Sequence, residues 1–148
     1  MNPPNSILIV NLVVTMFMVG LIWMVQVVHY PLFDDLGEQD YVSYQQRHQL
    51  KITYLVGPAM LLELVTALLM IWWPAEGVSI SLVYTGVGLI GVIWISTALV
   101  QVPCHEQLVK GFDLDAYRCL VKWNWVRTFA WTARGALVTW MLVRVLGD

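Results

Sequence analysis

The chain has 148 residues, of which 59% are hydrophobic and only 12% are charged, with a formal net charge of −2. Soluble globular domains carry about 25% charged residues, so this composition excludes an ordinary soluble domain and indicates an integral membrane protein. The sequence has no basic arm, zinc-finger spacing or glycine-rich phosphate loop, so we expect no nucleic-acid partner.

Four apolar runs follow one another along the chain. They cover residues 7–28, 52–73, 80–102 and 125–146. Each is close to the ~20 residues that an α-helix needs to cross ~30 Å of hydrocarbon. A helix of this length also satisfies its own backbone groups in lipid. We therefore expect an all-α integral membrane four-helix bundle that forms a single domain over residues 1–148.

Two polar connections, one after the first run and one after the third, share a pattern. An offset of 75 residues places Gln26 on Gln101, and an offset of 76 places His29 on His105. Each half then consists of a helix, a polar connection of roughly 20 residues and a second helix, which is the organisation of parallel membrane repeats. The sequence therefore predicts two parallel two-helix repeats whose polar connections meet on one side of the membrane.

Basic residues gather at these two connections. Those in or beside them are Arg47, Lys51, Lys110, Arg118, Lys122 and Arg127, whereas Arg144 lies near the opposite surface. Loops on the cytoplasmic side of a membrane are enriched in Lys and Arg. We therefore expect an inner or cytoplasmic membrane protein with both termini outside.

Two ionisable residues lie deep within apolar runs. Glu63 is in the second run and Arg134 is at a similar depth in the fourth, in helices expected to run in the same direction. A charge at that depth is costly unless it is paired, so we expect a Glu63–Arg134 ion pair. The pair either locks the bundle or faces a cavity, where it positions a ligand or moves a proton. Asn124, Arg127 and Trp131 lie on the same helical stripe as Arg134.

A second polar group is expected near the cytoplasmic face, contributed by all four helices. Its members are Gln26, His29, His48, Thr97, Gln101, His105, Asn124 and Arg127. Histidine is a natural general base near neutral pH, which makes His105 and His48 candidate catalytic residues. His29, His48 and His105 are also candidate ligands of a copper, iron or zinc ion. The alternatives are a site without any cofactor and histidines that only hydrogen-bond across the bundle.

The segment from Gln101 to Arg127 carries a family resemblance. Val102-Pro103, Leu108, Trp123-Asn124 and Arg127-Thr128, together with Tyr30-Pro31-Leu32 and His48, resemble a largely uncharacterised four-helix membrane family that includes the anthrone oxygenases. The resemblance covers nearly the whole chain. Asn124 and Arg127 match directly, whereas Gln101, His105 and His48 stand where asparagine is common in that family.

The resemblance implies the oxidation by dioxygen of an acidic, electron-rich aromatic carbon acid. His105 or His48 would be the base, and Arg127 or Asn124 would stabilise the developing oxyanion. The partners would then be the bilayer and an apolar aromatic, quinone-like or lipid-derived molecule, with a homo-oligomer left open. Two other classes stay open: a non-catalytic structural or accessory subunit whose polar residues lock the bundle, and a small transporter.

Overall fold

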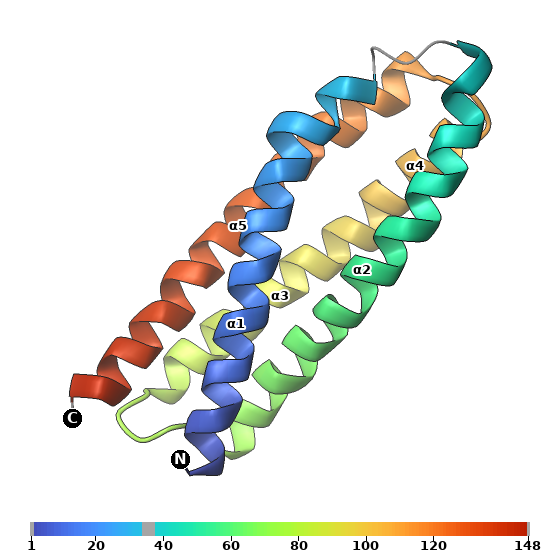
Figure 1. Ribbon diagram of the computed structural model, residues 1–148. Coiled ribbons are helices and arrows are strands. Elements are labelled where there is room, and N and C mark those ends of the chain that lie inside the picture. Colours follow the sequence, from blue (N-terminus) through green and yellow to red (C-terminus); the bar gives the residue numbers. More distant parts are fainter. Residues whose placement is uncertain (1, 34–37, 148) are drawn as a thin grey trace.

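The computed structural model describes residues 2–33 and 38–147, which form a bundle of long helices without strands (Figure 1). Helix α1 spans Pro3–Met24 and continues into a π-helical turn, η1 (Val25–His29), and a 3-10 turn, η2 (Pro31–Phe33). Helix α2 spans Glu38–Trp72. Helix α3 (Ile80–Ser96) continues through a second π-helical turn, η3 (Thr97–Gln101), into α4 (Val102–Leu108), and α5 spans Leu114–Gly147. The predicted all-α, four-helix architecture is confirmed.

The long helices lie side by side, and each packs against two neighbours. Helix α1 contacts α2 and α5, and α3 contacts the same two helices. The chain reverses direction between successive long helices, so α1 and α3 run parallel to each other and antiparallel to α2 and α5 (Figure 1). Both ends of the described chain lie at the same end of the bundle, beside the turn between α2 and α3. The two-helix repeat itself stays a prediction.

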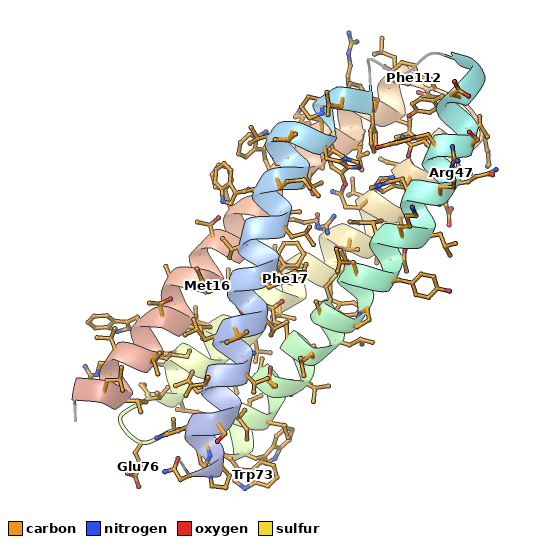
Figure 2. All side chains as sticks on the ribbon, viewed as in Figure 1. Met16, Phe17, Arg47, Trp73, Glu76 and Phe112 are labelled. Atoms are coloured by element: carbon orange, nitrogen blue, oxygen red, sulfur yellow. The ribbon has the colours of Figure 1, made fainter. Side chains whose placement is uncertain are left out.

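Three helical stretches are long and apolar enough to cross a membrane: Pro3–Phe33, Asp40–Trp72 and Ile80–Leu108. The predicted span at residues 125–146 is a helix. Within the described residues, however, it is not among the helices that are long and apolar enough to cross a membrane. Arg127 near its start and Arg134 nearer its middle lower its hydropathy, although α5 runs alongside the other three. Large apolar side chains such as Met16 and Phe17 are exposed along the middle of the bundle (Figure 2), as on a lipid-facing surface.

The helices continue well beyond the apolar runs. The sequence predicted polar connections of roughly 20 residues, but α2 already begins at Glu38 and α4 ends only five residues before α5 begins at Leu114. The cause is amphipathicity: each extension buries a stripe of apolar side chains and exposes polar ones. Tyr41, Leu108 and Leu120 are buried in one cluster at this end of the bundle.

The connection between α2 and α3 is a short turn. Gly77 adopts a left-handed backbone conformation with φ 78°, which glycine accepts without a steric penalty. The Ser79 hydroxyl then caps α3 by accepting a hydrogen bond from the backbone N–H of Ser81. Figure 2 places Trp73 and Glu76 at this end and Arg47 and Phe112 at the opposite end.

Candidate functional site

Both π-helical turns have a local cause in the sequence. Each ends two residues before a proline, Pro31 after η1 and Pro103 after η3. Proline has no N–H and its ring clashes with the carbonyl of the preceding turn, so a wider turn before it relieves the clash. Each π turn also changes the helical register, and such turns are frequent at functional sites. Gln101, the last residue of η3, is buried inside the bundle.

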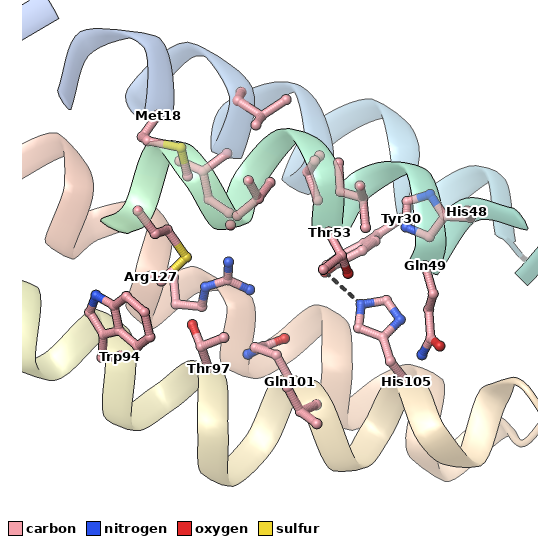
Figure 3. Close-up of a pocket in the computed structure, with 18 of the residues that line it drawn as sticks. Met18, Tyr30, His48, Gln49, Thr53, Trp94, Thr97, Gln101, His105 and Arg127 are labelled. Carbon is pink, nitrogen blue, oxygen red and sulfur yellow. Dashed lines mark hydrogen bonds between the residues drawn. The ribbon is translucent and has the colours of Figure 1, made fainter. Parts of the chain in front are cut away.

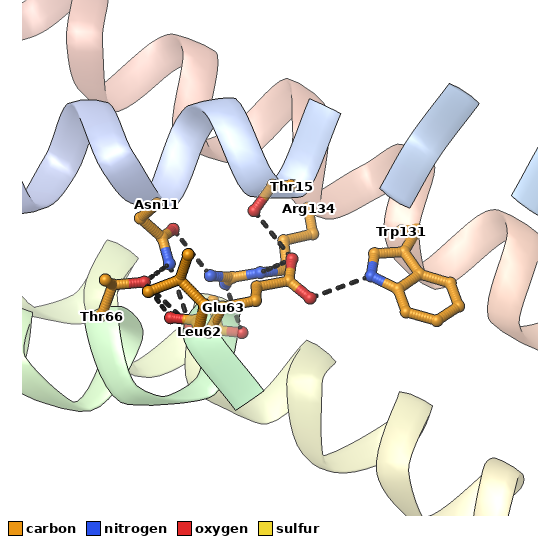
Figure 4. Close-up of polar contacts among 8 residues, drawn as sticks. Asn11, Thr15, Leu62, Glu63, Thr66, Trp131 and Arg134 are labelled. Carbon is orange, nitrogen blue, oxygen red and sulfur yellow. Dashed lines mark hydrogen bonds and ion pairs between the residues drawn. The ribbon is translucent and has the colours of Figure 1, made fainter. Parts of the chain in front are cut away.

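A closed polar network occupies the middle of the bundle (Figure 4). The Nε of Arg134 donates to Oε1 of Glu63 at 2.9 Å, so the predicted ion pair is present. The two terminal nitrogens of Arg134 donate to the carbonyl of Gly86 and to Oδ1 of Asn11, each at 2.8 Å. All three branches of the guanidinium are therefore engaged, although the residue is fully buried.

The carboxylate of Glu63 is equally well satisfied. Its Oε1 also accepts from the Thr15 hydroxyl at 2.7 Å, and its Oε2 accepts from Nε1 of Trp131 at 3.0 Å. Asn11 completes the network by donating to Oγ1 of Thr66 at 2.7 Å and to the backbone carbonyl of Glu63 at 3.0 Å. Buried charges are tolerated when they are paired and their remaining donors and acceptors are used, and this network meets both conditions.

Arg127 lies two helical turns before Arg134 on α5, and its surroundings differ. It is only 7% exposed. Within the described residues it has no carboxylate partner, and its Nε has no hydrogen-bond partner. Its guanidinium carbon lies 5.1 Å from the centre of the Trp131 ring, and Arg127 also interacts with the Tyr30 side chain. Trp131 thus joins the two arginines, since its indole N–H binds Glu63 and its ring face meets Arg127.

Arg127 faces a cavity of about 370 Å³ inside the bundle (Figure 3). The volume is within the range of about 300–1,000 Å³ that is typical of small-molecule sites. Apolar side chains from three helices form most of its wall, among them Met18, Ile22, Val56, Met60 and Trp94. Polar side chains collect at one end and include Tyr30, His48, Thr97, Gln101, His105 and Arg127. Thr97, Gln101 and His105 all line the cavity, so these polar side chains of η3 and α4 face the same space.

Several buried polar atoms at this end of the cavity have no hydrogen-bond partner among the described residues. They are both amide atoms of Gln101, Nδ1 of His105 and Nε of Arg127. A buried polar group left unpaired costs about 1–3 kcal/mol, which makes a cluster of them unusual in a finished core. A molecule that supplied hydrogen-bond donors and acceptors to Gln101, His105 and Arg127 would remove this cost. The cavity therefore has the properties of a binding site.

The three histidines lie close together but do not form the predicted metal site. His29 Nε2 and His48 Nδ1 hydrogen-bond to each other at 3.0 Å, and His105 Nε2 hydrogen-bonds to the Tyr30 hydroxyl at 3.2 Å. One ring nitrogen of each histidine is therefore engaged by another side chain. Over residues 2–33 and 38–147, no group of three or more His, Cys, Asp or Glu side chains is arranged to hold a metal ion. The assignment of His29, His48 and His105 as metal ligands is therefore wrong.

Asn124 does not line the cavity. Its Nδ2 donates to Oε1 of Gln26 at 2.8 Å, and Gln26 Nε2 donates to the carbonyl of Val121 at 3.3 Å. This contact joins η1 to α5, and Arg127 is the nearby α5 residue that lines the cavity. The expected role of Asn124 in oxyanion stabilisation stays a prediction. His29 likewise lies outside the cavity wall, whereas His48 and His105 are part of it.

The sequence reasoning gave no chemical role to Tyr30. This residue is buried, lines the cavity, and lies between His105 and Arg127, with which it interacts. Its only signal in the sequence was the Tyr30-Pro31-Leu32 motif, in which the proline explains the adjacent π turn. No family model, curated protein or solved structure matches the chain.

Proposed function

We propose that this protein is a membrane-embedded enzyme, similar in activity to the anthrone oxygenases, which uses dioxygen to oxidise an apolar aromatic or quinone-like carbon acid in the cavity beside Arg127. The observation that carries the proposal is the unpaired polar end of an otherwise apolar cavity, formed by Gln101, His105 and Arg127. A substrate with an apolar ring system and one oxygen that becomes anionic would complete it.

The reaction begins with the loss of a proton from the substrate carbon. His105 is the base, because its Nδ1 is buried without a partner while its Nε2 is held by Tyr30. This pairing fixes the imidazole ring, and a neutral ring whose Nε2 carries the proton leaves Nδ1 free to accept one. The negative charge moves onto the conjugated carbonyl oxygen of the substrate, where Arg127 and Gln101 stabilise it.

The carbanion then reacts with dioxygen, which is the oxidant. A carbon–oxygen bond forms as electrons pass from the substrate to oxygen, and the proton returned by His105 gives a hydroperoxide. Loss of the second hydrogen from the same carbon as a proton, with cleavage of the O–O bond, releases water and leaves a carbonyl group. The net change converts a CH₂ group and O₂ into a C=O group and H₂O.

We also propose that the protein lies in an inner or cytoplasmic membrane with both termini outside. The common location of both described chain ends supports this, as do Arg47 and Lys51 in the first part of α2 and Lys110 in the α4–α5 connection at the opposite end. A cysteine introduced at the exposed Glu76 in the α2–α3 turn should react with a membrane-impermeant thiol reagent in intact cells. Reaction only after lysis would reverse the orientation.

Turnover can be measured with anthrone as the test substrate and the protein in lipid vesicles, by following oxygen uptake and quinone absorbance. The His105→Ala variant should lose about 10²–10⁴-fold in rate, the usual contribution of a general base. His29→Ala is the matched control, because His29 is part of the same histidine cluster but does not line the cavity. Equal rates for wild type and His105→Ala, after subtraction of the protein-free rate, would overturn the assigned role.

A non-catalytic membrane subunit is the second candidate, and the closed network around Arg134 favours it. That network satisfies every branch of the guanidinium and joins α1, α2, α3 and α5 without leaving space for a ligand. On this alternative the Arg127 cavity would serve no reaction, and anthrone would be oxidised no faster than in protein-free vesicles. Oxidation that depends on both His105 and Arg127 would exclude it.

A further inference from the structure

We infer that the cavity takes up its ligand sideways from the bilayer, through an opening between α2 and the η3–α4 segment. The ligand class is a membrane-dissolved molecule with an apolar ring system or chain and a single acidic oxygen. This inference rests on the proposed use of the cavity as a substrate site. It adds the route of access and the membrane as the source of the ligand.

The two helices that border the opening separate as they approach the cavity. Near the chain ends they pack together, since Ala67 of α2 and Ile90 of α3 belong to one buried cluster. Farther along, both helices line the cavity. Figure 3 shows Thr53 and His48 of α2 directed toward the cavity from one side and Gln101 and His105 directed toward it from the other.

The rim of the opening is exposed on the outer surface of the bundle. Thr53 on α2 and Val102 and Glu106 on α4 line the cavity and are also exposed, so the same side chains belong to the wall and to the surface. Gly57, one helical turn from Thr53, also lines the cavity, and a Cβ atom added there would meet nothing within 4 Å. The wall is therefore open at Gly57.

The two ends of the cavity are closed by packed side chains. Toward η2, Phe33 is buried, and the centre of its ring lies 5.0 Å from the ring centre of His29 and 5.4 Å from that of His48. Tyr30 is hydrogen-bonded to His105 at the same end. In the opposite direction Met18, Met60, Ile93 and Trp131 form one buried cluster. The exposed lining residues Thr53, Val102 and Glu106 therefore place an opening between α2 and η3–α4.

The surface around the opening is suited to lipid. Leu99, next to the rim on η3, is 72% exposed, and Tyr54, next to Thr53, is 75% exposed. Both rims lie within the stretches that are apolar and long enough to cross a membrane. Exposed apolar side chains such as Leu99 and Tyr54 suit contact with hydrocarbon, whereas exposed Glu106 marks the edge of the opening toward the polar end of the bundle. A molecule dissolved among the acyl chains therefore reaches the opening without passing through water.

The ligand class follows from the arrangement of polar groups. The buried cation of Arg127 has no carboxylate among the described residues, and both amide atoms of Gln101 lack partners, so this end favours an anionic or enolic oxygen. The apolar body then lies against Val56, Met60 and Trp94. A free water-soluble anion would leave these apolar walls without contacts.

A photoreactive phospholipid tests this route. It carries an aryl diazirine in one acyl chain, and the wild-type chain is reconstituted with it in vesicles and irradiated, after which the labelled residues are mapped by mass spectrometry. The diazirine cannot leave the bilayer, so label on Met18 and Met60, which are 1% and 4% exposed, reports access from hydrocarbon. We expect these two residues to be labelled in addition to the outward-facing side chains.

The variant Gly57→Trp should abolish the label on Met18 and Met60 and leave the outer surface labelled. Gly20→Trp is the matched control, because an added Cβ also meets nothing within 4 Å there and Gly20 does not line the cavity. Label confined to outward-facing residues in the wild type, or cavity label that Gly57→Trp leaves unchanged, would overturn the inference. The readout needs no turnover, so failure to oxidise anthrone would reject the proposed function without affecting this result.

Discussion

Arg127 and Arg134 lie on the same helix, two turns apart and both buried, yet they are in opposite states. Arg134 is paired with Glu63, and all three branches of its guanidinium are hydrogen-bonded. Arg127 has no carboxylate among the described residues, its Nε has no partner, and it borders a cavity. A buried charge whose bonds are complete stabilises one arrangement of helices, whereas one whose bonds are incomplete beside a cavity is available to a ligand. Arg134 therefore has a structural role, whereas Arg127 is the arginine that we propose for ligand binding.

The largest expected effect comes from breaking the closed network. Arg134→Met leaves the carboxylate of Glu63 buried without its cation, and removal of one partner of a buried pair costs about 3–5 kcal/mol. We expect a corresponding fall in the free energy of unfolding, measured by chemical denaturation in mild detergent. The double variant Glu63→Gln with Arg134→Met should recover much of that loss, and strictly additive losses would contradict the pairing.

The matched change at Arg127 should not lower the free energy of unfolding. Arg127→Met removes a buried cation that has no carboxylate partner and replaces it with an apolar side chain of similar length, so unfolding should be unchanged or more costly. Oxidation of anthrone should fall by about 10²–10³-fold, the usual cost of removing one donor to a developing oxyanion. A loss of stability similar to that of Arg134→Met would remove the distinction between the two sites.

A smaller effect is expected at Gly86, where α3 meets the network. A Cβ added to Gly86 would lie 2.8 Å from Nη1 of Arg134, which is closer than real contacts allow. Gly86→Ala should therefore cost about 1–3 kcal/mol, as overpacking in a tight interior does. Gly88→Ala is the control, since an added Cβ there meets nothing within 4 Å. Equal stability of the two variants would show that the network tolerates displacement of Arg134.

The smallest effect tests the residue that links the two regions. Trp131→Phe keeps an aromatic face beside Arg127 but removes the N–H that donates to Oε2 of Glu63. One unpaired acceptor costs about 1–3 kcal/mol, but Glu63 retains its contacts with Arg134 and Thr15, which places the expected loss at the low end. Trp131→Phe should retain turnover. Trp131→Leu should have lower turnover than Trp131→Phe, because Arg127 then loses the aromatic face. Equal turnover in both variants would argue against the idea that the Trp131 ring positions the guanidinium of Arg127.

The ion pair at the centre of the closed network was predictable from the sequence for a simple reason, although the contacts of Asn11, Thr15 and Thr66 were not predicted. Glu63 and Arg134 are deep within apolar runs at similar depth, and a charge there needs a partner, so depth alone identified the pair. The four helices followed equally directly from composition and from the length of the apolar runs. These features depend only on position along a helix.

The cavity was not predictable in the same way. Helical spacing identifies a shared face, but it does not say whether the opposite helix fills the space in front of that face. Asn124 and Gln26 were both expected in the polar group near the cytoplasmic face, but they hydrogen-bond to each other and do not line the cavity. The amphipathic extension of α2 brought His48 next to His29, which turned two expected metal ligands into a hydrogen-bonded pair. The cavity and the partners of these polar side chains depend on how the helices contact one another, which helical spacing does not specify.

The most direct measurement compares thermal unfolding of the wild type and Arg127→Met in one detergent, with and without a hydroxylated anthraquinone as a product-like probe. Saturating probe should raise the melting temperature of the wild type, since a ligand at 100 times its Kd stabilises by about 2.7 kcal/mol. Arg127→Met should melt no earlier than the wild type and should not respond to the probe. An Arg127→Met variant that melts much earlier, or that the probe still stabilises fully, would contradict the assignment of Arg127 to ligand binding.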